Sequence, residues 1–195
     1  MPKLIDHDQR REHIIDVTWA LIVEGGIEAA TMREIAAKAG FANGALKHYF
    51  PSKAKIVEGT FDRAMRIVGA GLNTEQGRGL AGLRALSIAA IPRDEAAVTA
   101  GRVLMAYWEM SLANEEMRDR YEAFLADWRG LILRYLAEGR ADGDIVTATP
   151  DEVLVDELVL LTAGANIMTL VGRRFTTLEL VERHLDDFLG RLERR

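Results

Sequence analysis

Residues 31–50, TMREIAAKAGFANGALKHYF, decide how the N-terminal part of this chain folds. Thr31 and Glu34 have the Thr-x-x-Glu spacing of a capping box, which marks the start of a helix. Gly40 lies where that helix must end in a left-handed conformation, which glycine adopts without a steric penalty. The apolar residues that follow predict a second short helix packed back on the first. This pattern is typical of a helix-turn-helix, whose second helix lies in the major groove of DNA.

Polar and basic side chains remain on the outer face of this segment. The predicted second helix presents Asn43, Gly44, Lys47 and His48, followed by Tyr49. Residues 31–55 contain five basic residues and one acidic residue, a balance of +4, whereas the rest of the chain carries −9. A small basic patch on an acidic protein fits contact with phosphates through one face, and the alternative is chance clustering on a solvated helix.

Composition limits the class of protein. The chain has 195 residues, of which 49% are hydrophobic, so one or two folded domains are expected. It has no cysteine, which excludes disulfides and thiolate metal sites and fits a cytoplasmic location. The charged N-terminus lacks the apolar core of a secretory signal. The longest uncharged run, residues 158–172, is too short and too interrupted to span a membrane, and we interpret it as a buried helix.

Apolar residues recur at helical spacing along nearly the whole chain, which predicts an all-α fold. Ser52 is a plausible N-cap for the helix after the motif, and the turn Asp142-Gly143-Asp144 ends a long helix. We expect an N-terminal three-helix DNA-binding domain at residues 8–68 and a C-terminal helical domain for ligand binding and dimerisation at residues 74–195. Helices are expected near residues 9–24, 51–68, 80–91, 94–112, 115–141, 150–172 and 177–192, besides the two of the motif.

The last two predicted helices indicate assembly into a homodimer. The final helix has an apolar stripe at coiled-coil spacing, and the helix before it is apolar on nearly every face. A subunit interface would cover such a helix, and the alternative is that it forms the centre of the monomer core. The predicted interface residues are Leu161, Ala165, Met168, Leu178, Val181, Leu185 and Phe188.

Aromatic and acidic residues of the predicted C-terminal domain are candidates for an effector pocket. Glu109 beside an aromatic wall could hold a cationic ligand, a quaternary ammonium compound being one candidate. The alternative is that aromatic residues at helical spacing simply pack in the core. The predicted ligand-binding residues are Trp108, Tyr107, Glu109, Phe124 and Trp128.

No combination of residues predicts catalysis or a bound cofactor. His184 with Asp187 lacks further metal ligands at suitable spacing, and the serines lie in no nucleophile motif. Neither an enzyme nor a metal site is therefore expected.

The chain resembles the TetR family of transcriptional regulators between about residues 14 and 56. The resemblance depends on Thr31, Ile35, Ala36, Ala39-Gly40, Gly44, Leu46, Tyr49-Phe50 and Lys53 at the family's spacing. The start MPKL, the Arg10-Arg11 pair and the Ala106-Tyr107-Trp108 region are most similar to the branch of choline-responsive BetI-type repressors.

This resemblance implies a repressor that binds a palindromic DNA operator as a homodimer and is released by a small-molecule effector. It implies that Thr31, Tyr49 and Lys53 contact phosphate. The predicted DNA-binding residues are Thr31, Arg33, Asn43, Gly44, Lys47, His48, Tyr49 and Lys53. An activator with the same site is one alternative, and a helical small-molecule-binding protein or enzyme with an N-terminal interaction module is another.

Three residues depart from the family pattern. Ala42 replaces the usual Ser or Thr cap of the recognition helix, Lys47 replaces the usual Tyr, and Phe41 replaces the usual Val or Ile. We expect Ala42 and Lys47 to influence which operator sequence is bound.

Overall fold

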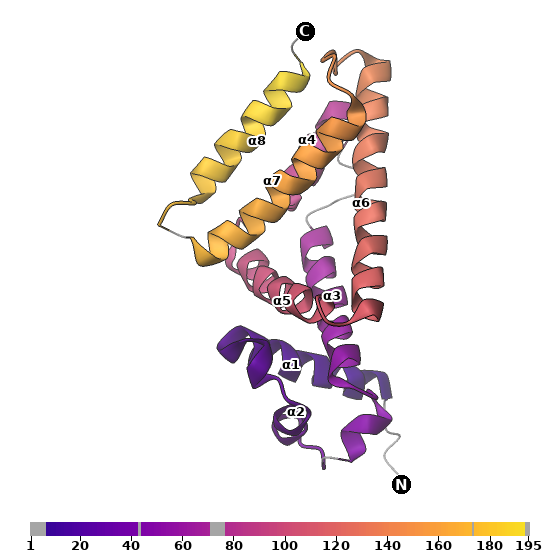
Figure 1. The fold of residues 1–195 in the computed structure, drawn as a ribbon, viewed down its shortest axis with the longest axis vertical. Coiled ribbons are helices and arrows are strands. Elements are labelled where there is room, and N and C mark those ends of the chain that lie inside the picture. The colour runs from indigo at the N-terminus through magenta and orange to yellow at the C-terminus, as the bar shows by residue number, and fades with distance from the viewer. Residues whose placement is uncertain (1–6, 43, 71–76, 173, 194–195) are drawn as a thin grey trace. The chain divides into compact units, whose positions relative to one another are not determined.

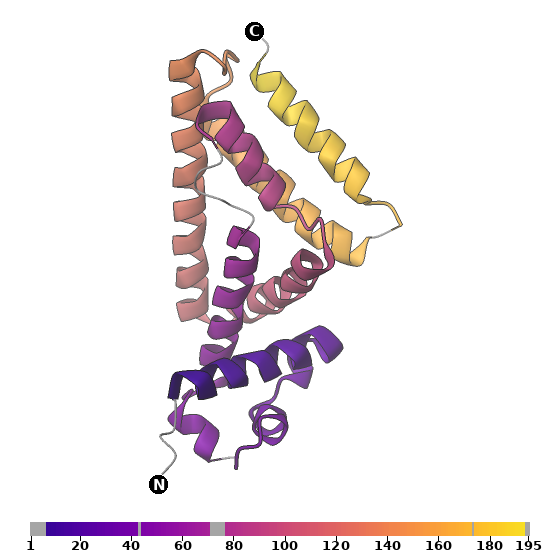
Figure 2. The ribbon, with the colours of Figure 1, turned by 180° about the vertical axis from the view of Figure 1, so that it is seen from behind.

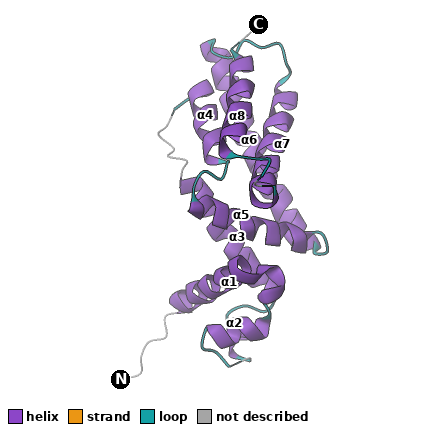
Figure 3. Ribbon diagram, turned by 90° about the vertical axis from the view of Figure 1, so that its left-hand side faces the viewer, coloured by secondary structure: helices purple, strands orange, loops and turns teal. Residues whose placement is uncertain are grey.

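A computed structural model describes residues 7–42, 44–70, 77–172 and 174–193, which form eight α-helices, one 3₁₀ helix and no strand (Figure 3). The predicted all-α fold is therefore confirmed. The helices are α1 (His7–Ala29), α2 (Met32–Lys38), η1 (Ala45–His48), α3 (Lys53–Ala70), α4 (Gly79–Ala89), α5 (Glu95–Ser111), α6 (Glu115–Asp142), α7 (Asp151–Val171) and α8 (Leu178–Leu192) (Figure 1).

The chain forms two compact units. The first unit comprises Met1–Met65 and Arg102–Arg118, and the second comprises Arg66–Gly101 and Asp119–Arg195. The first unit thus contains the end of α5 and the start of α6 as well as the N-terminal helices. The domain division at residues 8–68 and 74–195 stays a prediction.

Glycine interrupts the first helix where the sequence indicates. Gly26 has a left-handed backbone (φ 73°) in α1, and a short helical piece continues from it to Ala29. The apolar side of α1 packs in the first unit, where Ile14, Leu46 and Ile56 are fully buried.

Residues 102–118 pack on the N-terminal helices of the first unit through specific contacts. The Tyr107 ring stacks on Phe61 with centroids 4.2 Å apart, and its hydroxyl donates to the Met117 carbonyl at 3.0 Å. Lys55 of α3 donates to Glu116 of α6 at 2.5 Å and to the buried Glu58 at 3.0 Å. These polar and aromatic contacts explain why a segment distant in sequence belongs to the first unit.

The core of the second unit lies between α4, α6, α7 and α8, and α8 returns along α7 and α4 (Figures 1 and 2). Close approach of α4 to α6 depends on glycine, because a Cβ at Gly82 would overlap the ring of Tyr135. The buried core residues are Leu83, Leu86, Ile91, Ile132, Leu136, Ile145, Leu154, Val155, Leu158, Ala165, Val181, Leu185, Phe188, Leu189 and Leu192.

The turn after α6 is held by two ion-pair contacts. Arg78 donates to both carboxylate oxygens of Asp142 at 2.8 and 3.1 Å. Arg140 donates to Asp151 at 2.7 Å, which ties the end of α6 to the start of α7. Gly143 follows α6 with φ 83°, so the predicted turn is confirmed.

Helix α7 is long and apolar enough to cross a membrane by length and composition, a test that a core helix of a soluble protein also passes. One side of α7 packs in the second unit through Leu154 and Leu158, whereas Leu160 on another side is 72% exposed. The expectation of a helix buried within the chain is therefore met on one side only.

Candidate DNA-binding surface and effector site

Local hydrogen bonds shape the turn that follows α2. The Thr31 hydroxyl accepts from the Glu34 amide at 3.2 Å, which confirms the predicted N-cap. At the other end Gly40 has φ 73°, its amide donates to the Ala37 carbonyl at 3.3 Å, and the Phe41 amide donates to the Ala36 carbonyl at 2.9 Å. This is a Schellman arrangement, in which a left-handed glycine lets the chain reverse direction.

The predicted second helix of the motif is short, as expected, and has 3₁₀ geometry. Of the described residues between Gly40 and Pro51, those that are helical are Ala45–His48, which form a 3₁₀ turn (η1). Gly44 at its start supplies no side-chain cap. Ala42 cannot cap it either, and Pro51 follows close after it, so neither end favours extension. Asn43 lies outside the described residues.

The predicted DNA-binding side chains of η1 are on the surface. Lys47 and His48 are exposed, whereas the buried Leu46 anchors the turn in the first unit. The half-buried Tyr49 lies against Phe41, with ring centroids 5.3 Å apart. This aromatic contact joins the residue that ends η1 to the residue that follows Gly40.

The other predicted DNA-binding residues flank η1 in sequence. Thr31, Arg33 and Gly44 are exposed. Lys53 donates to the Ile27 carbonyl at 2.6 Å, so it ties the start of α3 to the end of α1. Its predicted phosphate contact therefore has to coexist with, or replace, a structural hydrogen bond.

Sequence reasoning did not assign a role in DNA binding to Arg10 or Arg11. Both are exposed on α1, and their guanidinium groups lie over the rings of Phe41 and Phe50. The adjacent arginines were visible in the sequence, but their position over these rings depends on tertiary packing.

The predicted effector residues are divided between the units. Tyr107, Trp108 and Glu109 belong to the first unit, and Phe124 and Trp128 belong to the second. Tyr107 is 0% exposed, and its hydroxyl donates a hydrogen bond to the Met117 carbonyl. Both observations favour the core-packing alternative for this residue. Trp108 is half-buried and Glu109 is exposed.

Phe124 and Trp128 form part of an aromatic row on α6. The row consists of Tyr121, Phe124 and Trp128, with successive ring centroids 6.0 and 6.4 Å apart and interplanar angles of 30° and 23°. All three side chains are half-buried. Sequence reasoning missed Tyr121, although its spacing of three and seven residues to the other two is the helical signal for one face.

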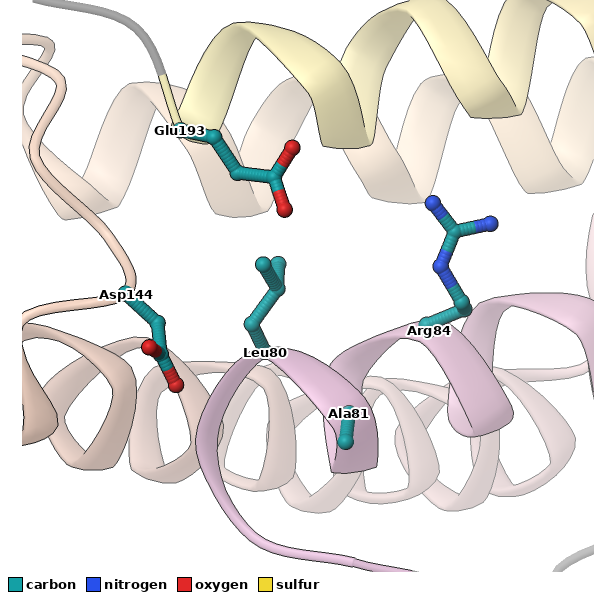
Figure 4. A pocket seen from close by; sticks show the side chains of 5 residues that line it. All are labelled: Leu80, Ala81, Arg84, Asp144 and Glu193. Carbon is teal, nitrogen blue, oxygen red and sulfur yellow. The ribbon is translucent and has the colours of Figure 1, made fainter.

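A shallow cavity of about 520 Å³ lies on another part of the second unit (Figure 4). It is lined by Leu80, Ala81, Arg84, Asp144 and Glu193. None of the predicted effector residues lines it, and Arg84 pairs with Asp186 at 2.9 Å. We assign it no ligand.

Most of the predicted interface residues face the core of their own unit. Ala165, Val181, Leu185 and Phe188 are buried there, which favours the monomer-core alternative for them. Leu161 and Leu178 are half-buried, and Met168 is exposed. The exposed apolar residues on α7 and in the turn after it are Val153, Leu160, Ile167, Met168, Val171 and Phe175.

Two protein families match the chain. Residues 14–60 match bacterial regulatory proteins of the tetR family, and residues 80–192 match the C-terminal domain of BetI-type transcriptional repressors. The second match alone covers more than half of the chain.

Similar proteins support both matches. The chain is 47% identical over 57 residues to the HTH-type transcriptional regulator PksA of Bacillus subtilis (strain 168), covering 29% of this chain and 28% of PksA. It is 27% identical over 158 residues to the HTH-type transcriptional regulator BetI of Yersinia pestis (strain Pestoides F), covering 73% of this chain and 79% of BetI.

A solved structure has the same fold. It is a putative transcriptional regulator from Saccharomonospora viridis in complex with choline, with a TM-score of 0.82 and 24% identity. The similarity covers 94% of this chain and 96% of that one.

Proposed function

Because this chain belongs to the TetR family and carries the C-terminal domain of BetI-type repressors, we propose that it binds a palindromic operator as a homodimer and is released by a small organic cation. It is a ligand-responsive, DNA-binding transcriptional regulator and not an enzyme. Its site of action is then the cytoplasm, where the operator DNA is found. Whether it represses or activates a gene depends on where the operator lies relative to the promoter.

The observation that carries the proposed DNA contact is the geometry of the turn. Gly40 reverses the chain after α2, and the buried Leu46 holds η1 so that Lys47 and His48 are exposed together. A lysine in this position can donate to purine edges or to phosphates. Thr31, Arg33, Tyr49 and Lys53 would contribute backbone contacts around it.

The exposed apolar face of α7 supports the proposed dimer. Leu160 is 72% exposed, and Val153, Ile167 and Val171 recur on the same helix at steps of seven and four residues. Contiguous exposed apolar residues mark an interaction surface, and a two-fold operator requires two linked DNA-binding units. Gly164 lies within this stretch, and a Cβ there would meet no atom within 4 Å, so another helix can approach closely.

The aromatic row on α6 supports the proposed effector class. Ring faces attract ammonium groups within about 6 Å of their centroids, and several rings together suit a quaternary ammonium ion. The solved structure from Saccharomonospora viridis holds choline. We therefore propose that Phe124 and Trp128 contact a choline-like cation, with Tyr121 extending the same surface.

A gel-shift and footprinting experiment on the DNA that flanks the gene tests the DNA contact. We expect salt-sensitive, sequence-selective binding to a palindromic site. Lys47→Ala should alter base preference, whereas Lys53→Ala should weaken binding about equally across sequences. If the two variants behave alike, this division of roles is wrong.

A thermal-shift and gel-shift titration with choline tests the effector class. We expect choline to raise the unfolding temperature by mass action and to release DNA, whereas ethanolamine, which lacks the methyl groups, should do so only at higher concentration. Phe124→Leu and Trp128→Leu should each weaken the choline response. The control is Trp19→Leu, because Trp19 is a half-buried aromatic residue of the first unit whose ring lies against Arg63. No response to any quaternary ammonium compound would overturn the effector class and leave the DNA contact standing.

A further inference from the structure

Two arginines at the start of α1 lie on aromatic rings of the helix-turn-helix segment. The Arg10 guanidinium carbon is 5.5 Å from the centroid of Phe41, and that of Arg11 is 4.7 Å from the centroid of Phe50. Both fall within the range of about 6 Å in which a ring face attracts a cation. Phe50 is buried and Phe41 is half-buried, whereas both arginines are exposed. The rings are therefore fixed supports, and the arginines are surface groups.

Helical spacing gathers positive charge on one side of α1. Arg10 and Arg11 share a side with His7 and with the fully buried Ile14, because these residues recur at steps of three and four. The centroid of the His7 ring lies 5.7 Å from that of Tyr49, so a third residue on this side of α1 contacts an aromatic ring of the helix-turn-helix segment. The acidic residues of these turns are Asp8 and Glu12, and Asp8 lies one helical turn before Arg11.

A guanidinium group that lies on a ring can still bind phosphate. Stacking uses the flat face of the group, while its N–H donors point outward in its plane and can bind two phosphate oxygens at once. A supported arginine also loses less conformational freedom when it binds. In Figures 1 and 2 the start of α1 lies beside η1, so a DNA backbone that passes η1 also passes this end of α1.

We propose that Arg10 and Arg11 are additional phosphate-binding residues of the DNA-binding surface, and that Phe41 positions Arg10. This inference rests on the proposed DNA contact of η1. It also explains why Phe41 stands where the TetR family usually has Val or Ile, because neither of those residues has a ring face that could support an arginine.

Salt titrations of operator binding test the two arginines. We expect Arg10→Ala and Arg11→Ala each to weaken binding several-fold and to make the plot of log affinity against log salt shallower by about 0.9 per lost contact. Arg183→Ala removes the same charge from α8 in the second unit and should leave affinity and slope unchanged. If the parent protein binds its operator and both arginine variants keep its slope, the inference is overturned while the proposed function stands. If the parent protein shows no selective binding, both fail.

A double-mutant comparison tests the role of Phe41. Phe41→Leu keeps an apolar side chain but removes the ring face, and we expect it to weaken operator binding about two- to fivefold. The same substitution should have no further effect in the Arg10→Ala background. An equal loss in both backgrounds would show that Phe41 only packs the turn, which would overturn its positioning role.

Discussion

Residues 31–50 and the helix α7 both expose groups that we propose contact a partner, and the chemistry of the two surfaces differs. The turn is shaped by local hydrogen bonds at Thr31 and Gly40, and it exposes charged groups such as Lys47. Helix α7 exposes apolar side chains such as Leu160, which have no directional preference. The proposed function depends in the first case on contacts between residues close in sequence, and in the second on contacts with another subunit.

The two surfaces should be sensitive to different kinds of mutation. A directional turn loses function when one backbone or capping group changes, because its hydrogen bonds cannot be replaced from elsewhere. An apolar face tolerates exchange of similar side chains and fails when a charge has to be buried in it. Three pairs of variants at matched positions in the two units, and one pair within the second unit, test this contrast.

The largest effect is expected from placing a charge on the exposed face of α7. Leu160→Arg should give a folded monomer, because Leu160 is 72% exposed and contributes little to the fold of its own chain. Operator affinity should fall about 100-fold or more, since two linked DNA-binding units bind far more tightly than one. Analytical ultracentrifugation and gel shifts measure the two effects.

Leu112→Arg is the control for that change. Leu112 is 81% exposed in the turn after α5, and it lies in the first unit. We expect this variant to sediment with the same mass as the parent protein and to bind the operator with the same affinity. A Leu160→Arg protein that still sediments as a dimer would show that α7 is not the interface.

Two left-handed glycines should give the next largest effect. Gly40→Ala and Gly143→Ala each place a Cβ on a backbone with positive φ (73° and 83°), where no atom lies within 4 Å to clash with it. The cost is therefore conformational, about 1–2 kcal/mol of unfolding free energy for each variant. Urea unfolding should show similar losses, while only Gly40→Ala weakens operator binding. Equal effects on DNA binding would mean that the turn after α2 has no special role.

Sequence reasoning succeeded where the structure depends on near neighbours. The caps at Thr31 and Ser52, the left-handed Gly40 and the turn at Gly143 were all predicted, because each acts through groups within a few residues. Helix bounds in the second unit were also predicted closely. The 3₁₀ form of η1 was not predicted, because the absence of a capping side chain at Ala42 does not by itself determine whether the following turn is α or 3₁₀.

Long-range packing was outside the reach of the sequence pattern. The stripe of α8 was correctly seen as apolar, but its period does not say which neighbour covers it, and Leu185 and Phe188 face their own core. Likewise the spacing around Tyr107 predicts a helix, whereas its stack on Phe61 joins positions far apart in the chain. For the same reason, the contact between the Arg10 guanidinium and the Phe41 ring could not be predicted from the sequence pattern.

Two threonine caps provide a smaller and closely matched pair. The hydroxyls of Thr31 and Thr177 each accept from a backbone amide at 3.2 Å, at the starts of α2 and α8. Thr31→Ala and Thr177→Ala should each lower the unfolding free energy by about 1 kcal/mol. Only Thr31→Ala should also weaken operator binding, and Thr31→Ser should restore both properties. If Thr177→Ala reduced DNA binding as much, the threonine cap of α2 would have no direct contact with phosphate.

The smallest effect is expected from the surface pair of Arg78 and Asp142, and it should depend on pH. The hydrogen bonds from Arg78 lower the pKa of the Asp142 carboxyl below its ordinary value of 3.8. A carboxyl whose pKa is lowered by folding stabilises the folded state above its unfolded pKa, and this contribution disappears as the pH falls through the folded pKa. Arg78→Gln should therefore be less stable than the parent at neutral pH, with the gap closing below about pH 3.8.

Urea unfolding at several pH values measures that gap, and Asp142→Asn is the matched variant because it removes the titrating partner instead. Both groups are exposed, so the gap at neutral pH should be smaller than that of either threonine variant and should shrink in salt. A gap that stays constant down to acidic pH would show that Arg78 acts by packing at the start of α4. In that case apolar contact, and not charge, would hold the second unit together at this turn, whereas directional hydrogen bonds shape residues 31–50 of the first unit.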